Sequence, residues 1–204
     1  MLKIKEFEAK TETEALEKAT SDCHCQQEDL FYETTFEEGK LFKGSKYKLK
    51  VVTRDDLNEY LLDFCKELGN KMGFPITAEL QYLETTVTVR LNSEQNAILI
   101  GKEGRTLNAI QIVLRQSLHN LINTSLKIVV DVGNYKEKKL KKLEHEIKSL
   151  AKEVSATGME IALDPMNSYE RRFVHSIVAD IEGVTTESIG EGKERHIIIK
   201  KVEE

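Results

Sequence analysis

The chain has 204 residues and a formal net charge of −5, with 32% charged and 40% hydrophobic residues. No apolar run approaches the roughly 20 residues that a membrane-spanning helix needs, and the N-terminus lacks the apolar core of a signal peptide. The sequence therefore predicts a cytoplasmic protein without stable membrane insertion. Three cysteines, an odd number, argue against a disulfide framework.

The charges are unevenly distributed along the chain. Residues 1–40 carry five lysines against eleven Asp and Glu residues, whereas residues 101–150 carry ten Lys and Arg residues against five acids. We therefore expect a local basic surface in the middle of the chain rather than general affinity for polyanions.

Residues 1–52 predict a small β-α-β-β unit. Apolar residues at 2, 4, 7 and 9 indicate a strand, with a change of phase at Lys5-Glu6. Thr11 to Glu14 have the spacing of a capping box that opens a helix. Residues 31–36 and 47–52 are typical of strands, joined by a Gly-containing turn region over 38–46. The size and position of this unit resemble the N-terminal domain of the Jag proteins.

A Cys23-His24-Cys25 tripeptide follows the predicted helix and raises the question of a metal site. Tetrahedral zinc needs four ligands, usually in two separated pairs, and the sequence offers no second pair. We therefore predict a polar loop here, with no metal and no cofactor.

Residues 54–133 predict the order helix, strand, strand, helix, helix, strand. The first helix covers 55–70 with a core stripe from Leu57 to Leu68, and Gly69 and Asn70 are stop signals. The remaining elements are two strands, a short helix, a helix of about five turns and a third strand, predicted at 76–83, 86–91, 94–100, from 105 onward and 127–132. The long helix is expected to bury Leu107, Ile110, Leu114, Leu118 and Leu121.

A Gly-x-x-Gly tetrapeptide, Gly101-Lys102-Glu103-Gly104, joins the two consecutive helices. Glycines permit a tight turn and a close backbone approach, and the helix that follows offers outward amides to phosphate oxygens beside Lys102 and Arg105. This order resembles a bacterial, type II KH domain. The resemblance implies that Gly101, Lys102, Glu103, Gly104 and Arg105 clamp about four single-stranded nucleotides. Glu103, an acid, either weakens this site or points to solvent.

Residues 134–157 predict a highly charged helix with a narrow apolar seam. A lysine cluster at 136–142 is typical of a solvated face, although its position after the KH strand also suits an extended phosphate track. The seam favours packing on a neighbouring domain, and self-pairing into a homodimer is the alternative.

The C-terminal part predicts a strand at 159–163, a helix that starts at Asn167 and is ended by Gly183, and a strand pair at 184–189 and 196–200. The segment from Met166 to His175 resembles the R-three-H domain, named for an Arg and a His separated by three residues. This resemblance implies RNA contact by Arg171, His175 and Arg195. The alternative is that Arg171 and His175 only brace the helix against the sheet.

Three resemblances in one order identify the chain with the Jag/KhpB family. They imply an α+β protein of three small domains in series, at residues 1–52, 54–133 and 134–204. They also imply a non-catalytic single-stranded RNA-binding protein, a post-transcriptional regulator of cell elongation and division, with a small KH protein of the KhpA type as partner. The alternative is a protein-interaction adaptor whose RNA-binding domains are weak or vestigial. An enzyme is not expected, because the histidines are scattered and no nucleophile or NTPase phosphate loop accompanies them.

Overall fold

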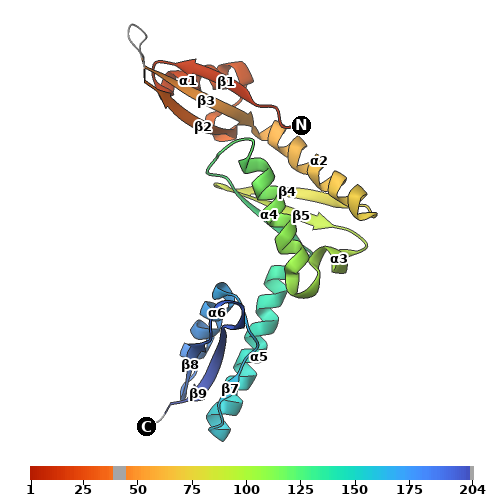
Figure 1. Cartoon of the computed structure of the whole chain (residues 1–204), viewed down its shortest axis with the longest axis vertical. Coiled ribbons are helices and arrows are strands. Elements are labelled where there is room, and N and C mark those ends of the chain that lie inside the picture. The colour runs from red at the N-terminus through yellow and green to blue at the C-terminus, as the bar shows by residue number, and fades with distance from the viewer. Residues whose placement is uncertain (39–44, 203–204) are drawn as a thin grey trace. The chain divides into compact units, whose positions relative to one another are not determined.

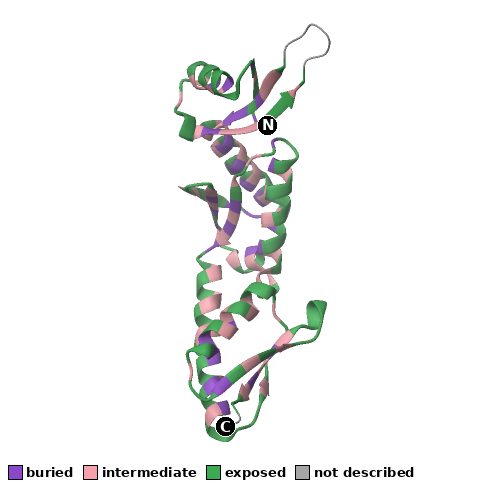
Figure 2. Ribbon diagram, turned by 90° about the vertical axis from the view of Figure 1, so that its left-hand side faces the viewer, coloured by how far each residue is buried: buried purple, intermediate pink, exposed green. Residues whose placement is uncertain are grey.

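The computed structural model describes residues 1–38 and 45–202 and divides the chain into two compact units, Met1–Gly133 and Asn134–Glu204. Figure 1 shows three small sheets, two in the first unit and one in the second. Buried residues line the strands and the inward faces of the helices, whereas exposed residues cover the outward faces (Figure 2). The finer division at residues 52–54 and 133–134 into three domains remains a prediction.

The N-terminal β-α-β-β unit is present. Its antiparallel sheet has the order β1-β3-β2, and the Thr11 hydroxyl accepts the Glu14 amide proton at 3.2 Å, as the capping spacing predicted. The helix buries Ala15 and Ala19 against the sheet. Most of the predicted turn region 38–46 lies outside the described residues. The elements are β1 (Lys5–Ala9), α1 (Glu12–Cys23), the 3-10 turn η1 (Gln27–Asp29), β2 (Leu30–Glu37) and β3 (Lys46–Thr53).

The rest of the first unit follows the predicted order of a type II KH domain. Strand β5 is central, antiparallel to β4 and parallel to β6, so that β6 forms one edge of the sheet. Buried Leu107, Ile110, Leu114 and Leu118 hold α4 against this sheet. The elements are α2 (Arg54–Met72), β4 (Thr77–Leu83), β5 (Thr86–Asn92), α3 (Asn96–Ile100), the 3-10 turn η2 (Lys102–Gly104), α4 (Arg105–His119) and β6 (Lys127–Val132).

Two predicted helix ends in this region are wrong. Helix α2 does not stop at Gly69 and Asn70 but runs to Met72, and Gly73 caps it at φ +83°. Gly69 is buried, and a Cβ there would lie 2.8 Å from the Phe74 carbonyl oxygen, so this glycine serves close packing rather than termination. Helix α4 ends at His119, which leaves Leu121 exposed beyond it.

The second unit packs two helices on a three-stranded antiparallel sheet with the order β7-β9-β8. The seam of α5 is buried within this unit at Ile147, Ala151 and Val154, which agrees with packing on a neighbouring element. Helix α6 ends at Ala179 rather than at Gly183, and Ile181 packs on the core from the turn that follows. The elements are α5 (Tyr135–Thr157), β7 (Ile161–Ala162), α6 (Ser168–Ala179), β8 (Val184–Ile189), the 3-10 turn η3 (Gly192–Glu194) and β9 (His196–Lys201).

Neither a membrane-spanning helix nor a metal-binding cluster is found in the described part of the chain. Within 1–38 and 45–202, no helix combines the length and apolar character needed to cross a bilayer. The same residues contain no group of three or more His, Cys, Asp and Glu side chains placed to hold a metal ion.

Candidate nucleic-acid interface

The Gly-x-x-Gly loop is a tight turn that requires both glycines. Gly101 and Gly104 have φ values of +68° and +82°, a region that residues with a Cβ rarely adopt. A Cβ on Gly101 would lie 2.1 Å from the Thr106 hydroxyl oxygen. The turn closes when the Gly104 amide donates to the Gly101 carbonyl at 3.3 Å. Both glycines are partly exposed, and no side chain caps the start of α4 that follows them.

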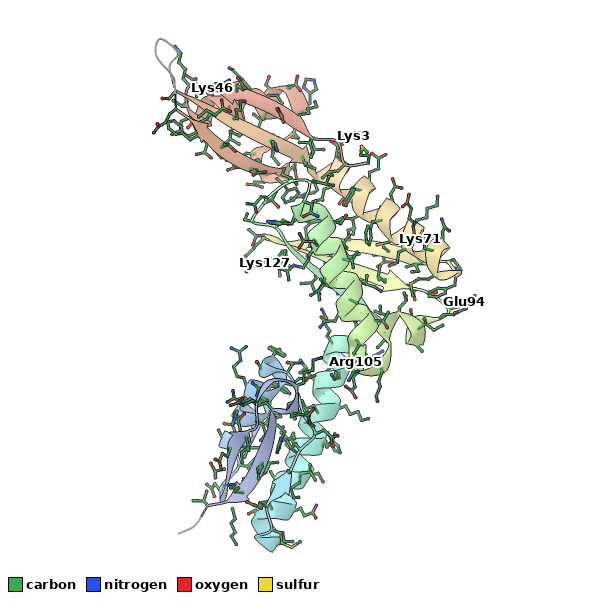
Figure 3. All side chains as sticks on the ribbon, viewed as in Figure 1. Lys3, Lys46, Lys71, Glu94, Arg105 and Lys127 are labelled. Atoms are coloured by element: carbon green, nitrogen blue, oxygen red, sulfur yellow. The ribbon has the colours of Figure 1, made fainter. Side chains whose placement is uncertain are left out.

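The charged side chains of this loop project outward. Lys102, Glu103 and Arg105 are all exposed, and Arg105 marks the end of α4 that meets the loop (Figure 3). A Glu103 carboxylate oxygen lies 3.7 Å from an Arg105 guanidinium nitrogen, in a solvent-exposed pair. Glu103 therefore points to solvent, in agreement with one of its two interpretations, and at the same time offsets part of the Arg105 charge. The pairing is weak because water screens exposed ions.

The backbone of Met166 connects two of the predicted RNA-binding arginines. The Arg171 guanidinium donates to the Met166 carbonyl oxygen at 2.9 Å, and the Met166 amide donates to the Arg195 carbonyl oxygen at 3.2 Å. Arg171 also donates to the Ser168 hydroxyl at 3.3 Å. The start of α6 and the turn before β9 are thus held together around one residue.

His175 and Arg195 both contact strand β8. The His175 Nδ1 atom lies 2.5 Å from the Thr186 hydroxyl oxygen, and the Arg195 Nε–H donates to the Ser188 hydroxyl at 3.0 Å. Thr186 and Ser188 are two residues apart and so share one face of the strand. The second unit therefore brings Arg171, His175 and Arg195 together. His175 braces α6 against the sheet through Thr186 of β8, whereas the contacts of Arg171 with Met166 and Ser168 lie at the start of its own helix.

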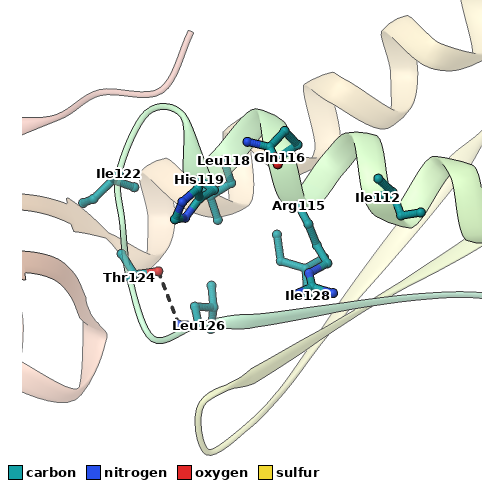
Figure 4. A pocket seen from close by; sticks show the side chains of 9 residues that line it. All are labelled: Ile112, Arg115, Gln116, Leu118, His119, Ile122, Thr124, Leu126 and Ile128. Carbon is teal, nitrogen blue, oxygen red and sulfur yellow. Dashed lines mark hydrogen bonds between the residues drawn. The ribbon is translucent and has the colours of Figure 1, made fainter.

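Two features of the candidate interface were not predicted from the sequence. Glu170, only 12% exposed at its side chain, pairs with Lys139 of α5 at 2.6 Å, a distant partner along the chain that no local pattern indicates. A pocket also lies beside the C-terminal half of α4 (Figure 4). The one sequence feature that pointed to this pocket was Ile112, an apolar residue that lies outside the core stripe of α4 and is exposed.

Comparisons with known proteins agree with this architecture. A model of the KhpA/KhpB KH domain matches residues 58–132, and a model of the R-three-H domain matches residues 138–201. A relative from Clostridium symbiosum, named RNA-binding protein KhpB, is 30% identical over 196 residues, which cover 94% of this chain and 88% of the relative.

Two further relatives carry the same name. The protein from Bacillus subtilis strain 168 is 28% identical over 81% of this chain and 83% of its own length. The protein from Lactiplantibacillus plantarum is 34% identical over 70% of this chain and 43% of its own length. KH and R-three-H domains bind ligands rather than catalyse reactions, so these matches do not describe an enzyme. The chain, with its KH and R-three-H domains in series on an α+β fold, belongs to the KhpB family of RNA-binding proteins.

Proposed function

We propose that this protein binds single-stranded RNA, without catalysis, through two sites. The first site comprises Gly101, Lys102, Glu103, Gly104 and Arg105, and the second comprises Arg171, His175 and Arg195. The observation that carries the proposal is the Gly101–Gly104 turn. Its left-handed glycines leave bare backbone at the uncapped, partially positive start of α4, beside two exposed cations.

At the loop, binding is electrostatic and depends on backbone access. A phosphate oxygen approaches the turn where no Cβ stands in its way, while Lys102 and Arg105 supply charge. The pairing with Glu103 reduces the contribution of Arg105 but leaves Lys102, for which no carboxylate lies within ion-pair distance in the described residues. We therefore expect modest affinity from this site alone.

At the second site, the internal hydrogen bonds of Arg171 orient its guanidinium and leave some of its donor hydrogens available. Each terminal nitrogen of a guanidinium carries two hydrogens, and Arg171 uses one from each for Met166 and Ser168. The remaining hydrogens form a fork that suits a phosphate, and the flat guanidinium suits stacking on a base. Because these internal hydrogen bonds and RNA binding use different hydrogens, the contacts with Met166 and Ser168 leave Arg171 able to bind RNA.

Two sites on one chain also raise the affinity for a strand that spans them. Once one site is occupied, the other meets the same RNA at high effective concentration. The family resemblance extends the proposal to a cytoplasmic regulator of cell elongation and division that pairs with a small KH protein of the KhpA type, with a homodimer as the other possible assembly.

A protein-interaction adaptor is the second candidate function. The Glu103–Arg105 pair is the observation that favours it, because an acid beside the phosphate path opposes RNA binding. In that case the acidic N-terminal unit recruits a protein partner while the other domains contribute little to RNA affinity.

The test measures fluorescence anisotropy of a labelled single-stranded RNA with the full chain at several salt concentrations. We expect binding at low salt that weakens linearly with the logarithm of salt concentration, since phosphate contacts release counterions. Unlabelled single-stranded RNA should displace the probe more effectively than a duplex of the same length. Failure to bind at low salt, or equal displacement by the duplex, would favour the adaptor.

A further inference from the structure

Helix α1 of the N-terminal unit ends at a pair of cysteines. Cys23 is the last residue of the helix, and Cys25 follows the left-handed residue His24. Both thiols are free and partly exposed, whereas the third, Cys65, is buried. The Cys23 and Cys25 side chains pack against the same core cluster, which contains Ala19. The two thiols therefore lie on one side of the turn.

The backbone at His24 sets the distance between the two cysteines. Its φ of 51° and ψ of 39° are close to the mirror image of α-helical values. The distance between the Cα atoms on either side of a residue depends only on the φ and ψ of that residue, and mirror-image conformations have the same distance. Helical geometry gives about 5.4 Å for it. Disulfides span Cα distances of roughly 4.4–6.8 Å, so Cys23 and Cys25 are close enough to bond.

Two backbone hydrogen bonds hold this turn in place. The His24 amide donates to the Ser21 carbonyl oxygen at 3.4 Å, and the Cys25 amide donates to the Thr20 carbonyl oxygen at 3.3 Å. A residue other than glycine rarely adopts a positive φ unless its surroundings hold it there. Groups that are held together in this way react at a high effective concentration.

The surroundings of the two thiols differ. Burial raises the pKa of the Cys25 thiol, and the negative charge of Cys23 raises it further. Lys5 pairs with Asp22 at 2.8 Å, and the pKa of its ammonium is raised by that hydrogen bond first and by the neighbouring Cys23 sulfur second. An oxidant from solution therefore meets Cys23 as the nucleophile, beside a cation, and Cys25 as the second thiol that resolves the product.

The charges along α1 favour a neutral oxidant. A recess of about 700 Å³ beside the turn is lined by three carboxylates, of Glu14, Glu17 and Asp22, together with Lys18 and His24. Excess negative charge disfavours the approach of anions such as glutathione disulfide. Hydrogen peroxide, which is small and uncharged, is free of this repulsion.

We propose that Cys23 and Cys25 form a peroxide-sensitive thiol pair that closes into a reversible disulfide. The Cys23 thiolate attacks one oxygen of hydrogen peroxide, the O–O bond breaks and hydroxide leaves, so that Cys23 becomes a sulfenic acid. The Cys25 thiolate then attacks the Cys23 sulfur, the S–O bond breaks and a second hydroxide leaves. The protons lost by the two thiols convert both hydroxides to water. Two thiols are thereby oxidised to one disulfide, and one peroxide is reduced to two waters.

This disulfide is suited to a switch rather than to a structural cross-link. It closes a very short loop, and the stabilisation that a disulfide provides grows with the length of the loop that it closes. A bond at a partly exposed position is also open to attack by a reducing thiol. Oxidation of the pair does not require RNA, so this site is independent of the proposed function.

The test is peptide mass spectrometry of the full chain after brief exposure to hydrogen peroxide. Cys23 and Cys25 lie between Lys18 and Lys40 with no other Lys or Arg between these two, so trypsin releases both thiols in one peptide. Peroxide is removed with catalase, and free thiols are blocked with iodoacetamide in denaturant before digestion. We expect the peptide to be two hydrogens lighter than its reduced form and to carry no blocked thiol, while Cys65 remains open to blocking. Dithiothreitol should restore two blocked thiols.

Single substitutions separate the roles of the residues. In Cys25→Ser the sulfenic acid of Cys23 has no partner, so dimedone should trap it. In Cys23→Ser the remaining thiol should take up little dimedone, because burial disfavours the Cys25 thiolate. Cys65→Ala removes the buried thiol and should leave the disulfide unchanged. His24→Gly keeps access to a positive φ and removes the imidazole, and it should still form the disulfide.

Four results would overturn the proposal. They are peroxide oxidation of Cys23 to a sulfinic acid while Cys25 stays open to blocking, a disulfide that joins two copies of the chain instead of closing within one, equal trapping by dimedone in Cys23→Ser and Cys25→Ser, and loss of the disulfide in His24→Gly. The last result would assign the reaction to the imidazole rather than to the geometry of the turn.

Discussion

Glu170 of α6 and Lys139 of α5 form an ion pair at 2.6 Å, with the Glu170 side chain only 12% exposed. The other carboxylate oxygen of Glu170 accepts the Asn167 amide proton at 3.2 Å, so one side chain caps its own helix and ties it to a second one. Arg171 follows Glu170 directly, and its guanidinium is held by Met166 and Ser168.

Replacing this carboxylate should destabilise the second unit. Glu170→Gln keeps the shape and a capping acceptor but removes the charge opposite Lys139, so we expect the free energy of unfolding to fall by about 1–3 kcal/mol. Urea denaturation, monitored by circular dichroism, measures this change in the free energy of unfolding. Glu187→Gln, which removes one of two exposed carboxylate partners of Lys200, should lower the free energy of unfolding much less. Equal losses in the two variants would contradict the greater contribution of the less exposed pair.

Gly101→Ala should disrupt the loop. The added Cβ meets the Thr106 hydroxyl at 2.1 Å in addition to the strain of a positive φ, so we expect a loss of stability of more than about 2 kcal/mol and loss of RNA binding at this site. Gly73→Ala is the matched control, since Gly73 has φ +83° but nothing lies within 4 Å of the position that its Cβ would take. That variant should cost only about 1 kcal/mol, and similar costs for both would argue against the Thr106 contact.

The His175–Thr186 contact separates bracing from binding. Thr186→Val keeps the shape of the side chain and removes the hydroxyl, so we expect stability to fall by about 1 kcal/mol while RNA affinity stays within about threefold. His175→Ala should lower both stability and affinity. If Thr186→Val weakens RNA binding as much as His175→Ala does, His175 acts by positioning rather than by contact. Thr185→Val, on the exposed face of β8, is the control.

Cys65 should react slowly with thiol reagents in the folded protein. Burial on α2 raises the pKa of its thiol to about 11, so at pH 8 only about one molecule in a thousand carries the thiolate. Ellman's reagent should therefore modify the partly exposed Cys23 first and Cys65 last, and unfolding in concentrated urea should remove the difference. Equal rates in the native protein would show that α2 opens readily.

The local patterns of the sequence specified most of the fold. Periodic apolar residues located every strand, and the Asn167–Glu170 spacing predicted the capping box that the structure contains. The errors fell at helix ends, because a glycine can either terminate a helix or allow close packing inside one. Gly183 follows a turn beyond α6, and Gly69 sits inside α2 because the chain returns against it at Phe74 and Ile76. Only tertiary packing separates these uses.

The candidate site was partly predictable for the same reason. The loop residues and the Arg-His pair are contiguous, so motif spacing found them, and the structure places the predicted residues of each motif in one neighbourhood. Contacts between distant segments left no local signal. The Lys139–Glu170 pair joins two helices, and the α4 pocket needs residues from a helix, a loop and a strand.

The most direct test of two-site RNA binding compares the wild-type chain with two double variants at several salt concentrations. Lys102→Asp/Glu103→Asp adds negative charge at the loop, and Arg171→Ala/His175→Ala removes the second site, with Lys71→Asp as a control for charge at a distant exposed position. We predict that each double variant weakens binding of a labelled single-stranded RNA by about tenfold or more, or about 1.4 kcal/mol, and that the control does not. Absence of wild-type binding at low salt, or affinity unchanged in both double variants, would contradict the account.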